Sequence, residues 1–256
     1  MKREGGLPGL GWLAVGWYGV FLLGPLVLVA ATSFATRGTY GGIEWLVSTE
    51  NFLRAADPLY LAILWRSLVL ASSTTVACLL LGFPIALAMA TASSRSRSVF
   101  VLLLAIPFLT NLVIRICAIK SFMSYDGPFA TTLTAFGIEF DPYSLSQNSS
   151  LVTFGMISSY LPFMVFPLFA ALEKFDFSLV EAAQDLGAHY GAVVWRVLLP
   201  IMRGPIVAGC LLVFVPAMGE FLIPDLLGGA KTMLAGNLIS EQFLKARDWP
   251  FGSSLS

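Results

Sequence analysis

Five long apolar segments dominate this sequence and limit the folds open to it. They cover residues 12–34, 64–90, 99–122, 151–172 and 205–222. About 20 mostly apolar residues are enough for a helix to cross a membrane. Glycine and proline recur inside the segments, and the neighbouring helices of a bundle can satisfy the backbone groups that these residues free. The pattern therefore predicts an all-α fold, a polytopic transmembrane helical bundle with five spans.

The composition agrees with a membrane bundle and disfavours other classes of protein. Hydrophobic residues make up 57% of the chain and charged residues 12%, whereas a soluble domain carries about 25% charged residues. Lys and Arg number 15, and Asp and Glu also number 15. Because these charges balance, no net field attracts a nucleic acid. We expect membrane lipid around the chain and no nucleic acid as a partner.

Basic residues in short loops predict the orientation of the bundle. Two of them precede the first segment, Arg95 and Arg97 lie in the turn 91–98, and others lie in the loop 173–204. Since short cytoplasmic loops are rich in Lys and Arg, we expect the N-terminus, this turn and this loop in the cytoplasm. The first apolar run has about 22 residues, longer than the 7–15 of a cleavable signal peptide, so it is interpreted as a retained helix.

The outer loops and the end of the chain carry further patterns. Residues 36–63, 124–150 and 224–250 contain apolar pieces that predict short interfacial or re-entrant helices. Residues 248–256 look like a loop that enters another helix. We therefore expect a truncated C-terminus and a missing sixth span. The whole chain, residues 1–256, is otherwise expected to form a single transmembrane domain.

The cytoplasmic loop 173–204 is itself patterned as helix. Ser178 followed by Glu181 fits a capping box, in which each side chain bonds a backbone amide of the first turn. Gly187 suits a helix C-terminus that needs a positive φ. A second helix is expected from about residue 191 to 199, before Pro200. A short helix with a small-residue face can fit closely into a groove on a partner protein.

A motif within this loop resembles a known family. Its residues are Glu181, Ala182, Ala183, Gly187, Val197, Leu199 and Pro200. Their spacing resembles the EAA motif of the permease subunits of binding-protein-dependent ABC importers, with Val197 where Ile is usual. The resemblance implies that Glu181, Ala182, Ala183 and Gly187 belong to a coupling helix that docks on the ATPase subunit.

A second stretch narrows the resemblance. Residues 209–229, with Phe175-Asp176 and residues 248–252, resemble the first permease of spermidine/putrescine importers. This implies the ABC importer permease fold and ATP-driven import of a polyamine delivered by a periplasmic or extracellular binding protein. It also implies a second permease subunit, an ATPase dimer and a multi-pass location in the bacterial inner (plasma) membrane.

No enzyme signature emerges from the sequence. His-Glu-x-x-His and Gly-x-Ser-x-Gly are absent, and Gly228 to Thr232 lacks the spacing of a phosphate-binding loop. We predict no catalytic residue, no metal site and no cofactor in this chain. ATP and Mg would bind the partner ATPase, so ATP hydrolysis needs a separate subunit.

Acidic and aromatic residues near the outer ends of the segments predict a path for the substrate. These residues are Glu220, Phe221, Asp225, Tyr125 and Asp126. A polyamine carries several positive charges, which carboxylates and aromatic ring faces attract.

Alternatives remain open at this point. Glu220 could form a structural ion pair with Arg115 or Lys120, and residues 125–126 could be a solvated loop. The chain could be an ABC permease for another small solute, such as iron, sulfate or thiamine. It could also be an ion-coupled secondary transporter, although the long capped loop argues against this.

Overall fold

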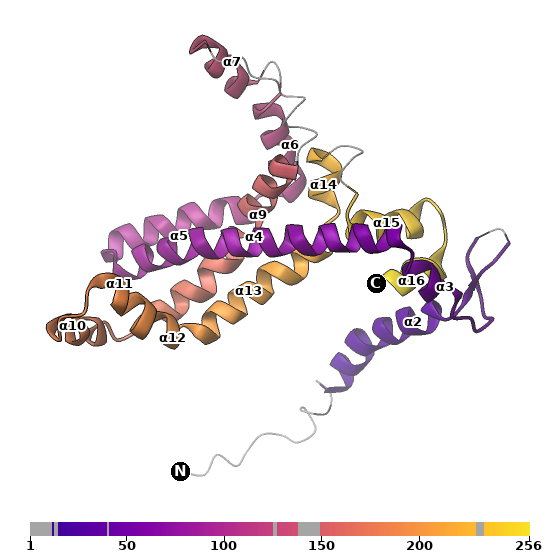
Figure 1. Ribbon diagram of the computed structural model, residues 1–256, viewed down its shortest axis with the longest axis horizontal. Helices are drawn as coiled ribbons and strands as arrows, with labels where there is room; N and C mark the ends of the chain where they lie inside the picture. The colour runs from indigo at the N-terminus through magenta and orange to yellow at the C-terminus, as the bar shows by residue number, and fades with distance from the viewer. Residues whose placement is uncertain (1–11, 13–14, 40, 125–126, 138–148, 229–232) are drawn as a thin grey trace. The chain divides into compact units, whose positions relative to one another are not determined.

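The computed structural model describes residues 12, 15–39, 41–124, 127–137, 149–228 and 233–256. Contacts divide the chain into two compact units. The first unit joins residues 1–63 with residues 238–256, and the second comprises residues 64–237. Helices dominate the described residues of both units (Figure 1).

The first unit combines short helices with a small antiparallel hairpin. Its elements are η1 (Gly19–Leu23), α2 (Gly24–Ser33), β1 (Thr36–Arg37), β2 (Ile43–Glu44), α3 (Glu50–Ala55) and α16 (Trp249–Leu255). It also contains the start of α4 (Pro58–Thr91) and most of α15 (Ala235–Leu244). The helix α3 agrees with the short outer helix expected within residues 36–63, whereas the hairpin was not predicted.

The second unit contains the rest of α4 and a series of helices. They are α5 (Ser94–Leu109), α6 (Leu112–Phe122), α7 (Pro128–Ala135), α9 (Ser149–Leu172), α10 (Ser178–Asp185), α11 (Tyr190–Val193), η2 (Val194–Leu198), α12 (Leu199–Ile201), α13 (Arg203–Met218) and α14 (Leu222–Leu227). The short helices α7, α14 and α15 agree with those expected in the outer loops.

The helices confirm the membrane bundle and refine its spans. Three helices in the described residues, Val15–Ser33, Pro58–Thr91 and Ser150–Leu172, are long and apolar enough to cross a membrane. Two bent pairs raise this number to five if each pair is one span. The pairs are α5 with α6, bent by 95°, and Tyr190–Ile201 with α13, bent by 73°. The predicted span 99–122 is thus not a single straight helix, and the bend of the second pair lies at Met202, before the predicted span 205–222.

The break within 99–122 has a local cause. Thr110 and Asn111 are extended, and the Asn111 side chain accepts a hydrogen bond of 2.8 Å from the Val113 amide. Asn111 therefore caps α6, as Asn commonly does at helix N-termini, instead of bonding a neighbouring helix. The predicted span 205–222 ends early, because α13 stops at Met218 and α14 begins at Leu222.

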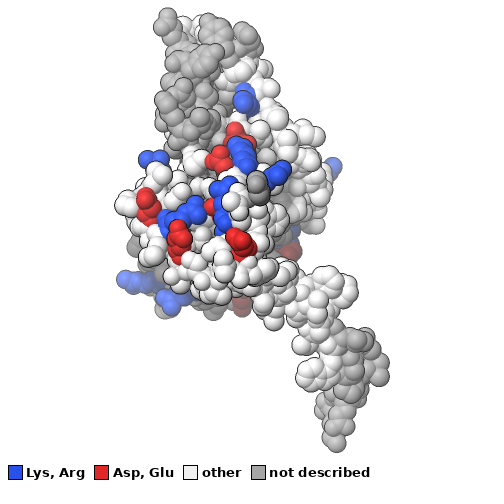
Figure 2. Space-filling model, turned by 90° about the vertical axis from the view of Figure 1, so that its right-hand side faces the viewer, with Lys and Arg blue, Asp and Glu red and all other residues white. Residues whose placement is uncertain are grey.

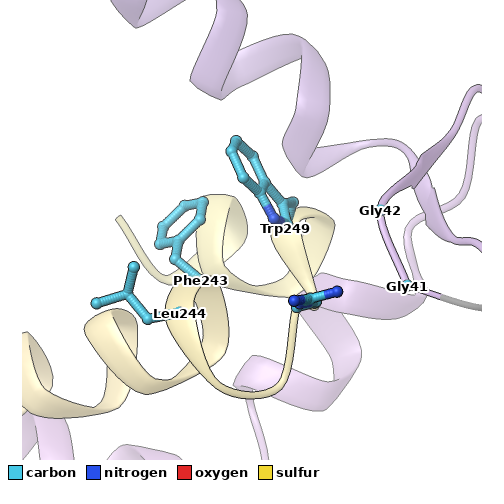
Figure 3. A pocket seen from close by; sticks show the side chains of 6 residues that line it. Gly41, Gly42, Phe243, Leu244 and Trp249 are labelled. Atoms are coloured by element: carbon cyan, nitrogen blue, oxygen red, sulfur yellow. The ribbon is translucent and has the colours of Figure 1, made fainter.

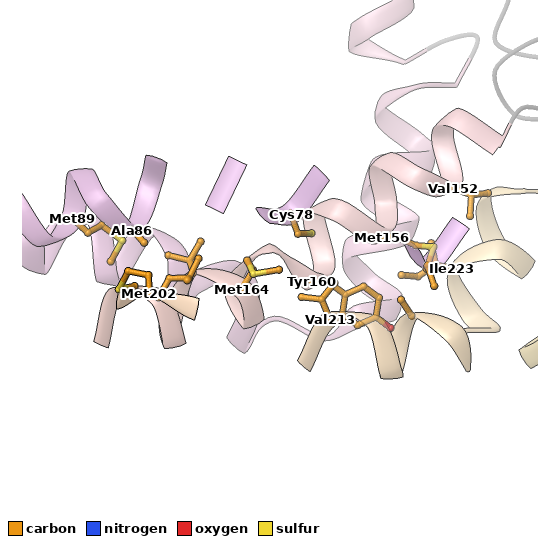
Figure 4. Packing of buried hydrophobic residues seen from close by; sticks show 14 of the residues in the cluster. Cys78, Ala86, Met89, Val152, Met156, Tyr160, Met164, Met202, Val213 and Ile223 are labelled. Carbon is orange, nitrogen blue, oxygen red and sulfur yellow. The ribbon is translucent and has the colours of Figure 1, made fainter. Parts of the chain in front are cut away.

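The core of the second unit is built around α9 (Figure 4). Buried side chains recur along this helix at Val152, Met156, Tyr160, Met164 and Leu168. This spacing of four places them on one face.

Small residues let the neighbouring helices approach α9. A Cβ at Gly82 of α4 would lie 3.0 Å from Met164 Cγ, and a Cβ at Gly209 of α13 would lie 2.8 Å from Met164 Sδ. The Met164 side chain thus contacts a glycine on each of two neighbouring helices, α4 and α13. Small residues at such contacts are typical of membrane helix packing.

The first unit has its own centre at Phe251, which is fully buried. The Arg54 guanidinium lies 4.1 Å above the Phe251 ring and pairs with Asp248 at 3.1 Å. Asp248 also accepts a hydrogen bond from the Phe251 amide and so caps α16. The stretch expected as a loop is therefore helical from Trp249 to Leu255.

An open pocket of about 470 Å³ lies in the first unit (Figure 3). The rings of Phe243 and Trp249 meet edge to face on one side, with centroids 5.7 Å apart. The backbone of Gly41 and Gly42 forms the other side, where both glycines have a positive φ.

Figure 2 shows basic and acidic side chains mixed on the face that it displays, without a separate positive or negative patch.

Candidate functional site

The loop that carries the motif forms a short helix with a defined end. Helix α10 spans Ser178–Asp185, and Gly187 follows it with a φ of +83°. The Gly187 amide donates to Gln184 O at 2.8 Å, and the Ala188 amide donates to Ala183 O at 3.0 Å. These two bonds form a Schellman motif, which ends a helix through a left-handed residue. The predicted positive φ at Gly187 is confirmed.

The start of α10 differs from the predicted capping box. Ser178 makes no capping bond; its amide donates to Asp176 Oδ1 at 3.0 Å. The helix begins at Ser178 with Phe177 as its N-cap residue, so Ser178 lies inside the first turn and Asp176 bonds its amide from outside the helix. The bonds from Ser178 lower the pKa of the Asp176 carboxyl. The helix is thus bonded at both ends within the chain.

The motif residues lie on the surface of the second unit. Glu181, Ala182 and Gly187 are exposed and Ala183 is half-buried. Apolar side chains are exposed beside them, with Leu186 at 90% and Trp195 at 73%. The next helical stretch, Tyr190–Ile201, includes the residues of the predicted second helix, 191–199. An exposed amphipathic helix flanked by apolar side chains is suited to docking on a partner.

Glu220 lies at a junction between helices. Its Oε2 accepts a hydrogen bond of 2.6 Å from the Tyr160 hydroxyl, and its Oε1 accepts from the amides of Leu222 at 2.9 Å and Ile223 at 3.3 Å. Glu220 therefore caps α14 and ties it to α9. Glu220 is buried, with 9% of its surface exposed. No ion pair joins Glu220 to Arg115 or Lys120 in the described residues.

Helix α15 holds this junction from another side. A Cβ at Gly236 would lie 2.5 Å from Gly219 O and 2.7 Å from Glu220 O. The Asn237 Nδ2 donates to Phe221 O at 2.8 Å. The Glu220 junction, defined as residues 219–222 with these contacts, is a closely packed break in an apolar helix.

Aromatic rings extend from the junction along α9. Tyr160 lies 6.1 Å from Phe163, measured between ring centroids, and Phe163 lies 5.2 Å from Phe108 of α5. Phe108 also lies 6.4 Å from Phe166. The sequence analysis missed this aromatic row, although the spacing of three between Tyr160, Phe163 and Phe166 places them along one side of a helix.

The remaining predicted path residues differ in exposure. Phe221 and Asp225 are exposed, and Asp225 lies in the first turn of α14. Chain continuity brings both next to Glu220. Tyr125 and Asp126 lie outside the described residues.

The chain resembles transport proteins in sequence. Residues 78–245 match the family described as binding-protein-dependent transport system inner membrane component. The spermidine/putrescine transport system permease protein PotB of Haemophilus influenzae is 42% identical over 240 residues, which cover 94% of this chain and 84% of that protein. PotB of Escherichia coli is 42% identical over 242 residues, which cover 94% and 88%.

Solved structures show a similar fold. The structure of a bacterial alginate ABC transporter in complex with an alginate pentasaccharide-bound periplasmic protein aligns with a TM-score of 0.73 and 17% identity. The alignment covers 97% of this chain and 86% of that chain. It identifies the fold as that of an ABC importer permease.

Proposed function

The chain belongs to the inner membrane components of binding-protein-dependent transport systems, and we propose that it is the permease subunit through which an ATP-driven importer moves polyamines. The proposal that the substrate is a polyamine rests on the 42% identity to spermidine/putrescine permeases over 94% of the chain. As a member of this family the chain is a transport subunit of the inner membrane, not an enzyme.

Helix α10 is the proposed contact with a separate ATPase. Glu181, Ala182, Ala183 and Gly187 would form this coupling surface. Exposure of α10 and the Schellman motif at its end support this role. In such an arrangement closure of an ATPase dimer displaces α10, and the displacement shifts the bundle between two conformations. ATP and Mg would bind the ATPase and not this chain.

The Glu220 junction is the proposed substrate contact. A polyamine ammonium group is attracted by a carboxylate and by aromatic faces. Glu220 supplies the carboxylate, Phe221 and Asp225 lie beside it, and Tyr160 begins the aromatic row. Tyr125 and Asp126 are proposed as further contacts on the sequence alone.

The remaining partners and the orientation follow from the same proposal. A second permease would complete the path, and a periplasmic binding protein would deliver the polyamine. The loop of α10 and the turn before α5 are proposed to be cytoplasmic, together with the N-terminus. The ion pair between Arg97 and Glu173 supports a common side for the turn and the loop.

Reconstitution in vesicles with the second permease, the ATPase and the binding protein tests the substrate. We expect ATP-dependent uptake of labelled spermidine or putrescine that excess sulfate, iron or thiamine does not reduce. Competition by one of these solutes would instead identify a different ABC substrate. Uptake that persists after ATP depletion would contradict ATP-driven transport.

The variant Glu220→Gln tests the substrate contact. Glutamine keeps the shape and can still accept from the Leu222 amide, so the variant removes mainly the charge. We expect polyamine uptake to fall at least about tenfold, because a hydrogen bond between an ammonium group and a charged carboxylate is worth on the order of 1.5–3 kcal/mol. Unchanged uptake would exclude Glu220 from the path.

Co-purification with the ATPase tests the coupling helix. In Gly187→Asp a residue with a Cβ must keep the positive backbone φ, and its side chain adds a charge to the docking surface. We expect this variant to lose most of the bound ATPase. Gly191→Asp is the matched control, because a Cβ at Gly191 makes only ordinary contacts of 3.5 Å with His189. Equal retention of the ATPase by both variants would contradict docking at Gly187.

A further inference from the structure

Arg97 connects two segments that are far apart in the sequence. Its Nη1 lies 2.8 Å from Glu173 Oε1, and its Nη2 donates to Ala90 O at 3.0 Å. Ala90 lies in the last turn of α4, where carbonyl groups lack helical partners. Glu173 directly follows α9. One guanidinium thus bonds the end of α4 and the end of α9, and its own residue lies in the first turn of α5.

The segment between Glu173 and α10 is short and firmly bonded. The Glu173 amide donates to Phe169 O at 2.8 Å, and the Phe175 amide donates to Leu172 O at 3.2 Å. The rings of Phe175 and Phe177 meet edge to face, with centroids 5.2 Å apart. Phe177 immediately precedes α10. This short, bonded connection is suited to carry a displacement of α10 to Glu173.

The bonds of Arg97 are incomplete in this conformation. Its Nε is buried without a hydrogen-bond partner. Its ion pair is partly exposed, at 33% for the Arg97 side chain and 46% for Glu173. Exposed pairs of this kind add little to stability, and a buried donor without an acceptor costs free energy. The ion pair with Glu173 is therefore a contact that can be exchanged at small cost in stability.

We propose that Arg97 is a positioning residue that transmits the displacement of α10, through Glu173, to the turn between α4 and α5. This inference rests on the proposed coupling role of α10. The reasoning is geometric: α9 and the stretch Tyr190–Ile201 connect α10 to the core through the chain, and Arg97 adds a connection from the end of α9 to α4 and α5. These connections must move together for the bundle to change conformation as a unit.

The reconstituted transporter tests this role through two separate measurements, polyamine uptake and ATP hydrolysis. In Arg97→Gln we expect the ATPase to co-purify as in wild type and to hydrolyse ATP. Uptake per ATP hydrolysed should fall about threefold to tenfold, in the range by which residues between coupled sites change coupling. Arg95→Gln is the matched control, because Arg95 is exposed and forms no ion pair among the described residues.

Two further variants separate transmission from folding. Glu173→Gln should lower the same ratio. The double variant should be no worse than Arg97→Gln, since both single variants remove the same contact between Arg97 and Glu173. Arg97→Lys keeps the charge but cannot bond Glu173 and Ala90 together, so it should give an intermediate ratio.

The proposal is overturned if uptake and hydrolysis fall in equal proportion, if the ratio stays at the wild-type value, or if Arg95→Gln lowers it as much. Failure of the wild-type chain to bind the ATPase has a different meaning, because it would refute the proposed coupling role of α10 itself.

Discussion

Gly236 provides a quantitative test of how tightly the Glu220 junction is packed. A Cβ at this position would lie 2.5 Å from Gly219 O, whereas ordinary contact begins at 3.4 Å. Both sides of this contact are backbone, so α15 and the junction must separate by about 0.9 Å in Gly236→Ala. A movement of this size would stretch the 2.8 Å bond between Asn237 Nδ2 and Phe221 O beyond 3.5 Å.

The loss of stability in Gly236→Ala follows from the overpacking and from the lost hydrogen bond. Overpacking costs about 1–3 kcal/mol, and the lost hydrogen bond costs about 1 kcal/mol. We expect Gly236→Ala to lower the free energy of unfolding by roughly 2–4 kcal/mol, from the sum of these two terms. The melting temperature in detergent, measured by circular dichroism, should fall by roughly 4–16 °C.

Two other glycines complete the experiment. A Cβ at Gly204 meets nothing within 4 Å, so Gly204→Ala should be neutral or slightly stabilising. A Cβ at Gly209 meets the flexible side chain of Met164 at 2.8 Å, which can move aside at moderate cost. The expected order of destabilisation is Gly204→Ala, then Gly209→Ala, then Gly236→Ala. If Gly236→Ala melted at the same temperature as Gly204→Ala, the close approach between Gly236 and the Glu220 junction would be refuted.

Three further predictions concern single contacts. Tyr160→Phe leaves Glu220 Oε2 without its donor, so we expect a loss of about 1–3 kcal/mol in thermal unfolding that the exposed control Tyr190→Phe does not show. Asn111→Ala removes the cap of α6 and should cost about 1 kcal/mol, seen as faster hydrogen exchange at residues 112–115; unchanged exchange would contradict the cap. The Asp176 carboxyl has a lowered pKa in the folded chain. Its contribution to the stability of α10 is therefore present above its ordinary pKa and is lost as the pH falls through the lower, folded value. Hydrogen exchange of α10 should quicken on acidification in wild type, and Asp176→Asn should lack this step.

The sequence predicted the features that depend on local averages. A run of about 20 apolar residues crosses a membrane whatever it packs against, so the positions of α4 and α9 followed directly. Gly187 was predictable because a helix end with a positive φ favours glycine over other residues.

Features that depend on a choice between partners were not predictable. Asn111 can cap a helix or bond a neighbouring one, and the hydrogen bond from the Val113 amide shows that it caps α6. The capping box expected at Ser178 does not form, because the helix begins at Ser178 itself and Asp176 bonds the Ser178 amide from outside the helix. Tyr160 and Glu220 are separated by 60 residues, so no local pattern pairs them.

The place of Met164 between Gly82 and Gly209 has a mechanical consequence. Branched side chains on adjacent helices interlock, and sliding one helix past another forces them through unfavourable rotamers. A methionine has no branch and three rotatable bonds, and a glycine presents no side chain to catch it. Met89, Met156 and Met202 are also among the largest fully buried side chains. At these methionine positions the packing around α9 can adjust to small sliding movements of the helices while its apolar surface stays covered.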